Sequence, residues 1–229
     1  MNSRGLFLSL LLVVMAGCAK VPFAHPALPT LVNPNPESIR SAFDRNTPKR
    51  FISEDTVIIN APFNQMAALG FVRVDRTAGT FDLMCLNHMG IQLFLLSGDR
   101  EKTEIRFALP PLMEQKTVLI AIAQDIRNMY LDVLPGPRAQ SRIHPKYVLF
   151  SDLKGQIDYE FGGDSLVLLQ KRHGDDLWPI WRVKYYEYVK GPDGLFPRGM
   201  VLDNYRYHYR IVVKNRFWKT ESNQGSQAD

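Results

Sequence analysis

Residues 156–171, QIDYEFGGDSLVLLQK, contain two runs with strand character joined by a tight turn. In the first run Ile157, Tyr159 and Phe161 alternate with polar residues, which is the period of a β-strand buried on one face. The Gly-Gly-Asp sequence that follows is typical of a hairpin turn, and an apolar run continues beyond it. The stretch therefore predicts an antiparallel β-hairpin.

The same alternation extends toward both ends of the chain. On the C-terminal side Trp181, Val183 and Tyr185 alternate with basic residues, and Ile211 and Val213 continue the pattern. On the N-terminal side, apolar or alternating runs separated by short turn sequences occupy residues 69–76, 80–86, 91–97 and 103–109. Because short connections join antiparallel neighbours, the chain is expected to be dominated by one antiparallel sheet.

Two segments have helical periodicity instead. Residues 37–45 predict a short helix. Farther along, apolar side chains spaced three, four and seven residues apart mark one helical face, at Leu112, Leu119, Ile122, Ile126, Met129 and Val133. Prolines bound this stretch at 110–111 and 135, which predicts a helix of about 20 residues. The combination predicts an α+β domain in which a helix lies on one face of a long antiparallel sheet.

Some of the predicted strands are apolar on both faces. Residues 93–96, Leu-Phe-Leu-Leu, and 166–169, Leu-Val-Leu-Leu, have no polar side. Such a strand needs cover on both faces or borders an apolar cavity. Two interpretations follow equally well: a helix with partial closure of the sheet, or a lipid-binding hollow inside a half-closed barrel.

The N-terminus has the pattern of a targeting signal. An arginine precedes an apolar run at residues 6–15, and Ala-Gly comes directly before Cys18. This arrangement is typical of a secretory signal peptide, and the apolar run is shorter than the about 20 residues that cross a bilayer. The cysteine resembles that of a bacterial lipoprotein signal, so we expect residues 1–17 to be removed and Cys18 to carry a diacylglycerol and N-acyl anchor. A plain signal peptide with a chance cysteine is the alternative.

The remainder divides by composition. Residues 18–36 are rich in proline and predict an extended tether, residues 37–218 a single domain, and residues 219–229 a polar tail. Ala19 follows the lipidation site where inner-membrane lipoproteins often have aspartate. Because this chain lacks that aspartate, its resemblance to bacterial lipoproteins favours anchoring at the outer membrane, on its periplasmic face.

The composition excludes several classes of protein. At 45% hydrophobic residues the chain is not disordered, and two cysteines, one of them lipidated, leave no internal disulfide or cysteine-rich metal site. Cys85 lies in an apolar strand pattern and is expected to be a small buried hydrophobe. A formal net charge of +5, spread along the chain, could favour an anionic lipid surface. Nucleic acid is not an expected partner outside the cytoplasm.

No catalytic pattern is present in the sequence. The histidines, which are His25, His88, His144, His173 and His208, have no spacing that would place two on one helix face for a metal. Serines lack a Gly-x-Ser-x-Gly setting, and no glycine-rich phosphate loop occurs. We therefore expect no enzyme, no metal and no cofactor besides the covalent lipid at Cys18.

Three stretches together resemble LolB-like outer-membrane lipoproteins. The first is residues 181–188, WRVKYYEY, followed by Pro197 and a Met-Val-Leu-Asp segment at 200–203. The second is the Leu-Pro-Gly that ends the long helix at 134–136, and the third is the Asn-His-Met-Gly turn at 87–90. This sequence differs from the LolB-like pattern in two respects. It has a tyrosine at 130 where the family often has tryptophan, and its connections at 137–152 and 175–180 are longer. Uncharacterised lipoprotein families that share the LolB-like fold are an alternative assignment.

The resemblance implies a curved antiparallel sheet, a half-open barrel wrapped over helices, enclosing an apolar cavity for acyl chains. It also implies an exposed apolar residue on a membrane-contacting loop, a position held here by Met89; a turn methionine folded back on the core is the alternative. Candidate cavity-lining residues are Phe71, Phe81, Leu83, Leu93, Leu95, Phe107, Ile157, Tyr159, Leu168 and Val183. The sequence does not determine which strand face turns inward.

The expected function is binding and transfer. An outer-membrane lipoprotein would hold the acyl chains of a lipid or lipoprotein in its half-barrel and help to insert them at that membrane. Outer-membrane lipids, an acylated cargo and a periplasmic carrier of LolA type are the expected partners, and we expect a monomer. The alternative is a tethered, non-enzymatic accessory subunit of an envelope assembly or lipid-export system, with the same fold and no ligand. A third alternative, an envelope hydrolase, would need a convergent nucleophile and base.

Overall fold

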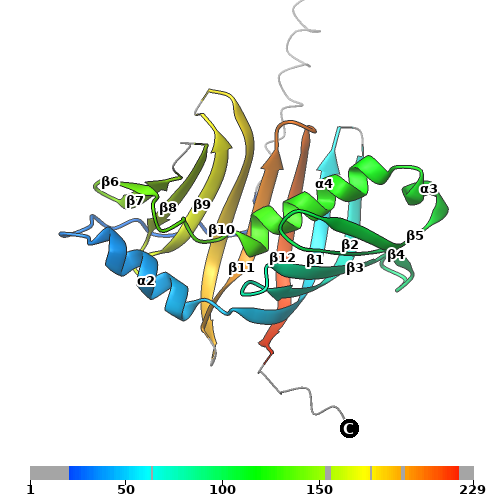
Figure 1. Ribbon diagram of the computed structural model, residues 1–229, viewed down its shortest axis with the longest axis horizontal. Helices are drawn as coiled ribbons and strands as arrows, with labels where there is room; N and C mark the ends of the chain where they lie inside the picture. The colour runs from blue at the N-terminus through cyan, green and yellow to red at the C-terminus, as the bar shows by residue number, and fades with distance from the viewer. Residues whose placement is uncertain (1–20, 63, 153–155, 176, 192–193, 222–229) are drawn as a thin grey trace, which may run out of the picture.

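The computed structural model describes residues 21–221 except 63, 153–155, 176 and 192–193. These residues form one twelve-stranded sheet that curves around the helices (Figure 1). The elements are α2 (Pro36–Asn46), β1 (Arg50–Ala61), β2 (Asn64–Asp75), β3 (Thr80–Leu86), β4 (Gln92–Gly98), β5 (Thr103–Ala108), α3 (Pro110–Met113), α4 (Lys116–Ile126), η1 (Arg127–Leu131), β6 (Gln140–Ile143), β7 (Tyr147–Ser151), β8 (Ile157–Gly162), β9 (Val167–Gly174), β10 (Pro179–Gly191), β11 (Gly194–Asn204) and β12 (Tyr209–Thr220).

The strands are antiparallel to their neighbours throughout, in the order β5-β4-β3-β2-β1-β12-β11-β10-β9-β8-β7-β6. Strand directions alternate along this order, so every odd-numbered strand ends at the same edge of the sheet. We call this edge the upper rim. Its residues are the strand ends Ala61, Leu86, Ala108, Ser151, Gly174 and Asn204 together with the chain that follows each of them.

The predicted fold class is confirmed: the domain is α+β, with a curved antiparallel sheet and few helices. The hairpin predicted at residues 156–171 is formed by β8 and β9. The sequence pattern does not predict β1, β6, β7 or β11, however. Strands β6 and β7 occupy the long connection at 137–152 and add two strands to the edge of the sheet beside β8.

Strand β1 is hard to recognise because its inward face is partly polar. Ser53 and Asp55 are fully buried, so an alternation of apolar and polar residues is not visible there. The Asp55 carboxylate accepts hydrogen bonds from the Tyr130 hydroxyl at 2.9 Å and from Asn215 Nδ2 at 3.0 Å, and Ser53 donates a third. Burial raises the pKa of Asp55 in spite of these bonds. The network shows how a polar group is accommodated inside the sheet: both oxygens of the buried carboxylate accept a hydrogen bond.

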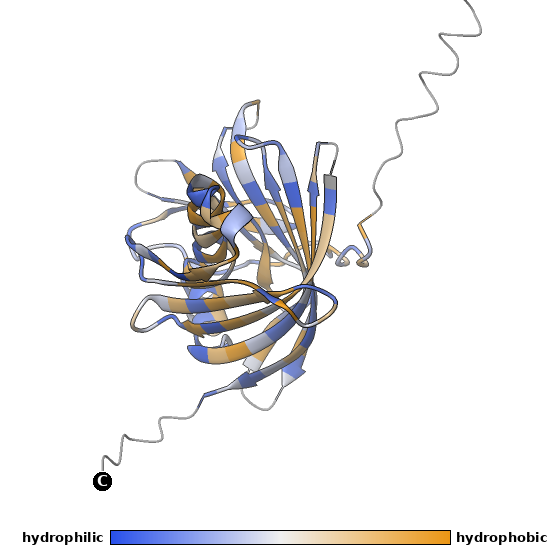
Figure 2. Cartoon of the chain, turned by 90° about the vertical axis from the view of Figure 1, so that its right-hand side faces the viewer, coloured by the Kyte–Doolittle hydropathy of each residue, from blue (hydrophilic) through white to orange (hydrophobic). Residues whose placement is uncertain are grey.

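The helices lie inside the curve of the sheet, where the apolar faces of the strands meet (Figure 2). The predicted helical face is confirmed, because Leu119, Ile126, Met129 and Val133 are all buried against the strands. The helix is shorter than predicted: α3 is separate, and the continuous helix runs from Lys116 to Leu131. The break follows from the backbone of Gln115, which at φ −104° and ψ 46° lies outside helical geometry.

Residues 21–35 contain no helix or strand, as expected for their prolines, but they are packed against the sheet. Phe23 is buried on the convex face, stacked on Tyr186 with ring centroids 5.4 Å apart. The Ala24 N–H donates to Glu187 at 2.9 Å, and the Leu31 N–H donates to the Pro145 carbonyl at 2.7 Å. The expectation of a free tether spanning 18–36 therefore needs correction from residue 21 onward, because burial of Phe23 outweighs the freedom of the extended chain.

Gly199 makes the docking of this segment possible. A Cβ at this position would lie 2.5 Å from the Phe23 ring, so any side chain here displaces that ring. We expect Gly199→Ala to release residues 21–31, raising their hydrogen-exchange rate and lowering the free energy of unfolding by about 1–3 kcal/mol. Gly136→Ala is the matched control, because a Cβ there meets nothing within 4 Å. Unchanged exchange in residues 21–31 of Gly199→Ala would contradict the prediction.

Candidate functional site

An apolar cavity of about 410 Å³ lies between α4 and the sheet. Its helical wall is formed by Leu119 and Ile122, and its sheet wall by inward-facing residues of β1, β2 and β12, among them Ile59, Met66 and Ile211. Its volume falls in the range of about 300–1,000 Å³ that is usual for small-molecule pockets. The lining is mainly apolar, so the cavity suits an alkyl chain better than a polar ligand.

The cavity opens at the upper rim. Ala61 at the end of β1 and Tyr207 in the turn between β11 and β12 both line it and are exposed. Val118 on the first turn of α4 also lines it and is 46% exposed. Because the helix break at Gln115 separates α3 from α4, the start of α4 forms one lip of the opening.

A small polar cluster adjoins the inner wall of this cavity. Tyr209 lines the cavity, and its hydroxyl donates a hydrogen bond to the buried carboxylate of Asp125 on α4. Asn204 Nδ2 donates to the same carboxylate at 3.3 Å. Burial raises the pKa of Asp125 to about 7, and the two hydrogen bonds oppose that shift. The cluster connects the C-terminal turn of α4 to the end of β11 and the start of β12.

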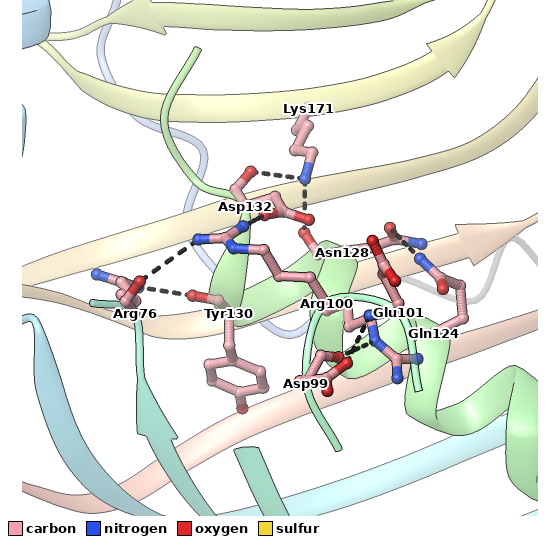
Figure 3. A network of polar contacts seen from close by, with 10 residues as sticks. Arg76, Asp99, Arg100, Glu101, Gln124, Asn128, Tyr130, Asp132 and Lys171 are labelled. Atoms are coloured by element: carbon pink, nitrogen blue, oxygen red, sulfur yellow. Dashed lines mark hydrogen bonds and ion pairs between the residues drawn. The ribbon is translucent and has the colours of Figure 1, made fainter. Parts of the chain in front are cut away.

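The C-terminal end of the helix is fixed by side chains on β9, on β10 and directly after β2, of which Figure 3 shows Lys171 and Arg76. Lys171 Nζ, on β9, donates to the carbonyls of Asn128 at 3.2 Å and Asp132 at 2.6 Å. The Tyr185 hydroxyl donates to the Met129 carbonyl, and Arg76 Nε donates to the Tyr130 carbonyl at 2.7 Å. These donors satisfy carbonyls that the end of a helix leaves free, so this end of the helix is held firmly against the sheet.

Lys171 is the least expected of these residues, because its charged group is fully enclosed. Its ammonium group lies 5.2 Å from the Trp181 ring centroid and 5.5 Å from that of Tyr159. Burial lowers its pKa to about 8, although the nearby charge of Asp132 opposes the shift. The helix carbonyls and aromatic faces together replace water around the cation.

None of the predicted wall residues lines this cavity. Buried inside the curve of the sheet are Phe81, Leu83, Tyr159, Leu168 and Val183, and partly buried against the same core are Leu93 and Ile157. Three others lie in one row on the convex face, where cross-strand pairing sets Phe71 beside Met84, Met84 beside Leu95 and Leu95 beside Phe107. For these three the inward orientation is wrong, because their neighbours Val72 and Leu96 occupy the inner face.

The sequence contains a partial signal for the residues that do line the cavity. Leu112, Leu119 and Ile122 belong to the helical face identified from their spacing. Tyr209 and Ile211 lie on one alternating face of the last strand, although the alternation does not determine which face turns inward. What the spacing alone does not show is which strands stand opposite the helix, since that depends on how the sheet curves.

The other predicted site residues lie elsewhere. Met89 is 68% exposed in the turn after β3, where the Asn87 side chain accepts hydrogen bonds from the N–H groups of Met89 and Ile91, both at 2.9 Å. Cys18 lies outside the described residues. Cys85 is buried as expected, and burial raises the pKa of its thiol to about 12.

A second, larger hollow of about 660 Å³ lies on the convex face beside Phe23. Its lining includes Lys190, Arg198, Lys214 and Arg216, so it is open and charged. An alkyl chain would gain little there, and we therefore assign the candidate site to the smaller apolar cavity. Within the described ranges, no three His, Cys, Asp or Glu side chains gather as metal ligands, and no helix has the length and apolarity to cross a membrane.

Comparison with solved structures identifies the architecture. The structure of a LolA superfamily protein from Nitrosomonas europaea matches with a TM-score of 0.54 and 7% sequence identity, over 81% of this chain and 93% of that chain. An outer membrane lipoprotein-sorting protein domain from Vibrio parahaemolyticus matches with a TM-score of 0.49 and 7% identity, over 83% of this chain and 93% of that chain. No protein-family model matches the chain, and no curated protein matches its sequence.

A curved antiparallel sheet that encloses helices defines a protein of the half-barrel class. More specifically, this chain has the fold of the LolA superfamily. The expectation of a LolA/LolB-like fold, drawn from the motif resemblance, is thereby confirmed.

Proposed function

We propose that this protein is a lipid-anchored envelope protein that binds an acyl chain in the cavity between α4 and the sheet and helps to transfer or insert it at the outer membrane. The observation that carries the proposal is the apolar cavity of about 410 Å³ with its opening at the upper rim. Each methylene group that enters such a cavity gains about 0.8 kcal/mol. A single chain would therefore bind firmly and still be released.

The way α4 is held supports a role in uptake. Its C-terminal end is fixed to the sheet through Lys171, Tyr185 and Arg76, whereas its first turn carries exposed residues at the cavity mouth. A helix held at one end can move at the other with little loss of packing. Movement of the first turn of α4 would widen the opening for an entering chain.

The proposed partners follow from this site. An acylated cargo, delivered by a periplasmic carrier of LolA type or taken from the outer membrane itself, would supply the chain. Met89, exposed on a turn whose backbone is fixed by Asn87, is proposed to touch that membrane. The protein is proposed to act by binding rather than by catalysis, and to be anchored through Cys18 on the periplasmic face of the outer membrane.

Native mass spectrometry with lipid extraction tests the proposal on the mature chain purified from a diderm host. We expect stoichiometric phospholipid or acyl species on the wild-type protein. Ala121→Phe, which places a ring in the cavity lining, should reduce the bound lipid at least about tenfold, since it fills space that the chain needs. Ile120→Phe is the matched control, because Ile120 is 53% exposed and does not line the cavity.

A clean apo mass, unchanged after incubation with lipid or acylated peptide, would contradict acyl binding. The tethered accessory subunit would then be the better account of the fold. Leu168 is unsuitable for this test: it is fully buried in the core, so a charge there would unfold the domain instead of blocking the cavity.

A further inference from the structure

Two large apolar side chains project from the upper rim between β9 and β10. Leu177 is 82% exposed and Trp178 is 79% exposed. Their exposure is imposed by the fold: the Asp175 carboxylate accepts hydrogen bonds from the N–H groups of Leu177 at 3.0 Å and Trp178 at 2.5 Å. Gly174 has φ +96°, and a Cβ there would lie 2.7 Å from the Trp178 carbonyl oxygen. The backbone therefore holds both side chains outward.

These side chains lie beside the mouth of the cavity. The Ile180 carbonyl, two residues after Trp178, accepts hydrogen bonds from the N–H groups of Tyr205 at 3.0 Å and Arg206 at 3.3 Å. This ties the β9–β10 connection to the β11–β12 turn, where Tyr207 is 47% exposed and lines the cavity. In Figure 1 the β9–β10 and β11–β12 connections project in the same direction. We call Leu177, Trp178 and Tyr207 together the rim wedge.

The N-terminal chain fixes how far this rim can lie from a membrane anchor. Phe23 packs with Val201 and Val212 on the convex face, and Val21 packs against the same group. Val21 is three positions from Cys18 along the chain, a span of at most about 11 Å. Along β11, Val201 is likewise three residues from the strand end at Asn204, or about 10 Å. An acyl group on Cys18 can therefore reach the level of the rim wedge without undocking Phe23.

We propose that the rim wedge inserts into the surface of the lipid bilayer that holds the Cys18 anchor, so that the cavity mouth opens at the bilayer. Tryptophan and tyrosine favour the membrane interface, because their rings are apolar with a polar edge. Arg206, stacked on Tyr207 at 5.7 Å, is placed to meet lipid phosphates. The acidic group next to the rim wedge, the Asp175 carboxylate, accepts hydrogen bonds from the backbone N–H groups of Leu177 and Trp178. The inference rests on the proposed lipid anchor, and does not require that the cavity hold an acyl chain.

Fluorescence of Trp178 tests the proposal directly. Trp181 is 7% exposed and Trp218 is partly buried, so Trp178 is the exposed tryptophan of the chain. The mature full-length protein is mixed with vesicles of phosphatidylethanolamine and phosphatidylglycerol that carry bromine in their acyl chains. We expect a blue shift and strong quenching that Trp178→Phe abolishes, because that variant keeps an apolar side chain and removes the reporter.

A second pair of variants measures how much the Leu177 side chain contributes to vesicle binding. In protein that carries no acyl group at Cys18, Leu177→Asp should weaken vesicle association about tenfold, which corresponds to losing the burial of one leucine side chain. Val32→Asp is the control, since Val32 is 85% exposed but lies in the segment before α2, away from the rim wedge. Equal quenching of wild type and Trp178→Phe on sedimented vesicles would overturn the proposal, as would failure of the wild-type chain to bind vesicles.

The cavity-filling variant Ala121→Phe separates this inference from the proposed function. If the rim wedge contacts the bilayer, Trp178 remains quenched in Ala121→Phe although acyl uptake is lost. Loss of quenching in Ala121→Phe would mean that Trp178 senses lipid in the cavity, and would overturn the bilayer contact. Absence of extractable lipid from the wild type, with quenching retained, would remove the acyl-binding function and leave the membrane contact standing.

Discussion

Replacing Lys171 with alanine is expected to lower the free energy of unfolding by about 3–5 kcal/mol. The substitution leaves a cavity in the core and removes the donor for the buried carbonyls of Asn128 and Asp132. Lys171→Met keeps most of the volume and also removes the cost of burying a charge, so it should lose about 1–2 kcal/mol. Urea unfolding followed by circular dichroism measures both values.

The pH dependence separates the charge of Lys171 from its packing. Its pKa is about 8 in the folded protein and 10.5 as an unperturbed group. Between these values the unfolded chain keeps a proton that the folded chain has lost, so wild-type stability should rise with pH across this window, by up to about 3 kcal/mol. Lys171→Met should lack that rise.

Lys146→Met serves as the control for these measurements, because Lys146 is exposed. Its stability should stay within about 0.5 kcal/mol of wild type, and its pH profile should follow that of wild type. Equal stability of Lys171→Ala and wild type would show that the helix end does not depend on this contact.

Asp125→Asn is expected to remove a second pH dependence, at lower pH and of opposite sign. The pKa of Asp125 is raised to about 7 from 3.8, so between these values the folded chain holds a proton that the unfolded chain has released. Wild-type stability should therefore fall as pH rises from about 4 to 7, by about 3–4 kcal/mol from this group. An amide cannot ionise, so the stability of Asp125→Asn relative to wild type should increase by that amount over the same range.

Measuring the difference between the two proteins isolates Asp125 from other groups. Burial also raises the pKa of Asp55 and Glu160, but both residues are present in wild type and variant and cancel. Tyr209→Phe gives an independent check: it removes a hydrogen bond that lowers the pKa of Asp125, so the window should move to higher pH. A stability difference that does not vary between pH 4 and 8 would contradict the assignment.

Much of the fold follows from periodicity in the sequence. The β8–β9 hairpin, strands β2 to β5 and α2 are found close to the predicted residues, because each alternates or repeats with a clear period and ends at turn residues. Strand β1 is not predicted by its periodicity, because two of its core-facing residues, Ser53 and Asp55, are polar and belong to a buried hydrogen-bond network. Periodicity detects apolar burial and does not detect a buried polar group whose partners lie far away in the chain.

The residues of the candidate site could be predicted less well from the sequence. Phe71, Leu95 and Phe107 are as apolar as the residues inside, yet strand pairing places them in a row on the convex face. In strands that are apolar on both faces, hydrophobicity cannot distinguish the inner face from the outer one. The cavity lies instead where α4 crosses β1, β2 and β12, a contact between segments far apart in the chain.

The sequence by itself determined the α+β class, the antiparallel pairing of consecutive strands and the apolar face of the long helix, because these depend on local spacing. The lipoprotein signal that ends at Cys18 remains a prediction from the sequence. The tertiary structure alone decided the position of the cavity, the docking of Phe23 on Gly199 and the enclosure of Lys171 by helix carbonyls. Each of these arises from the curvature of the sheet, which brings together residues that no local period connects.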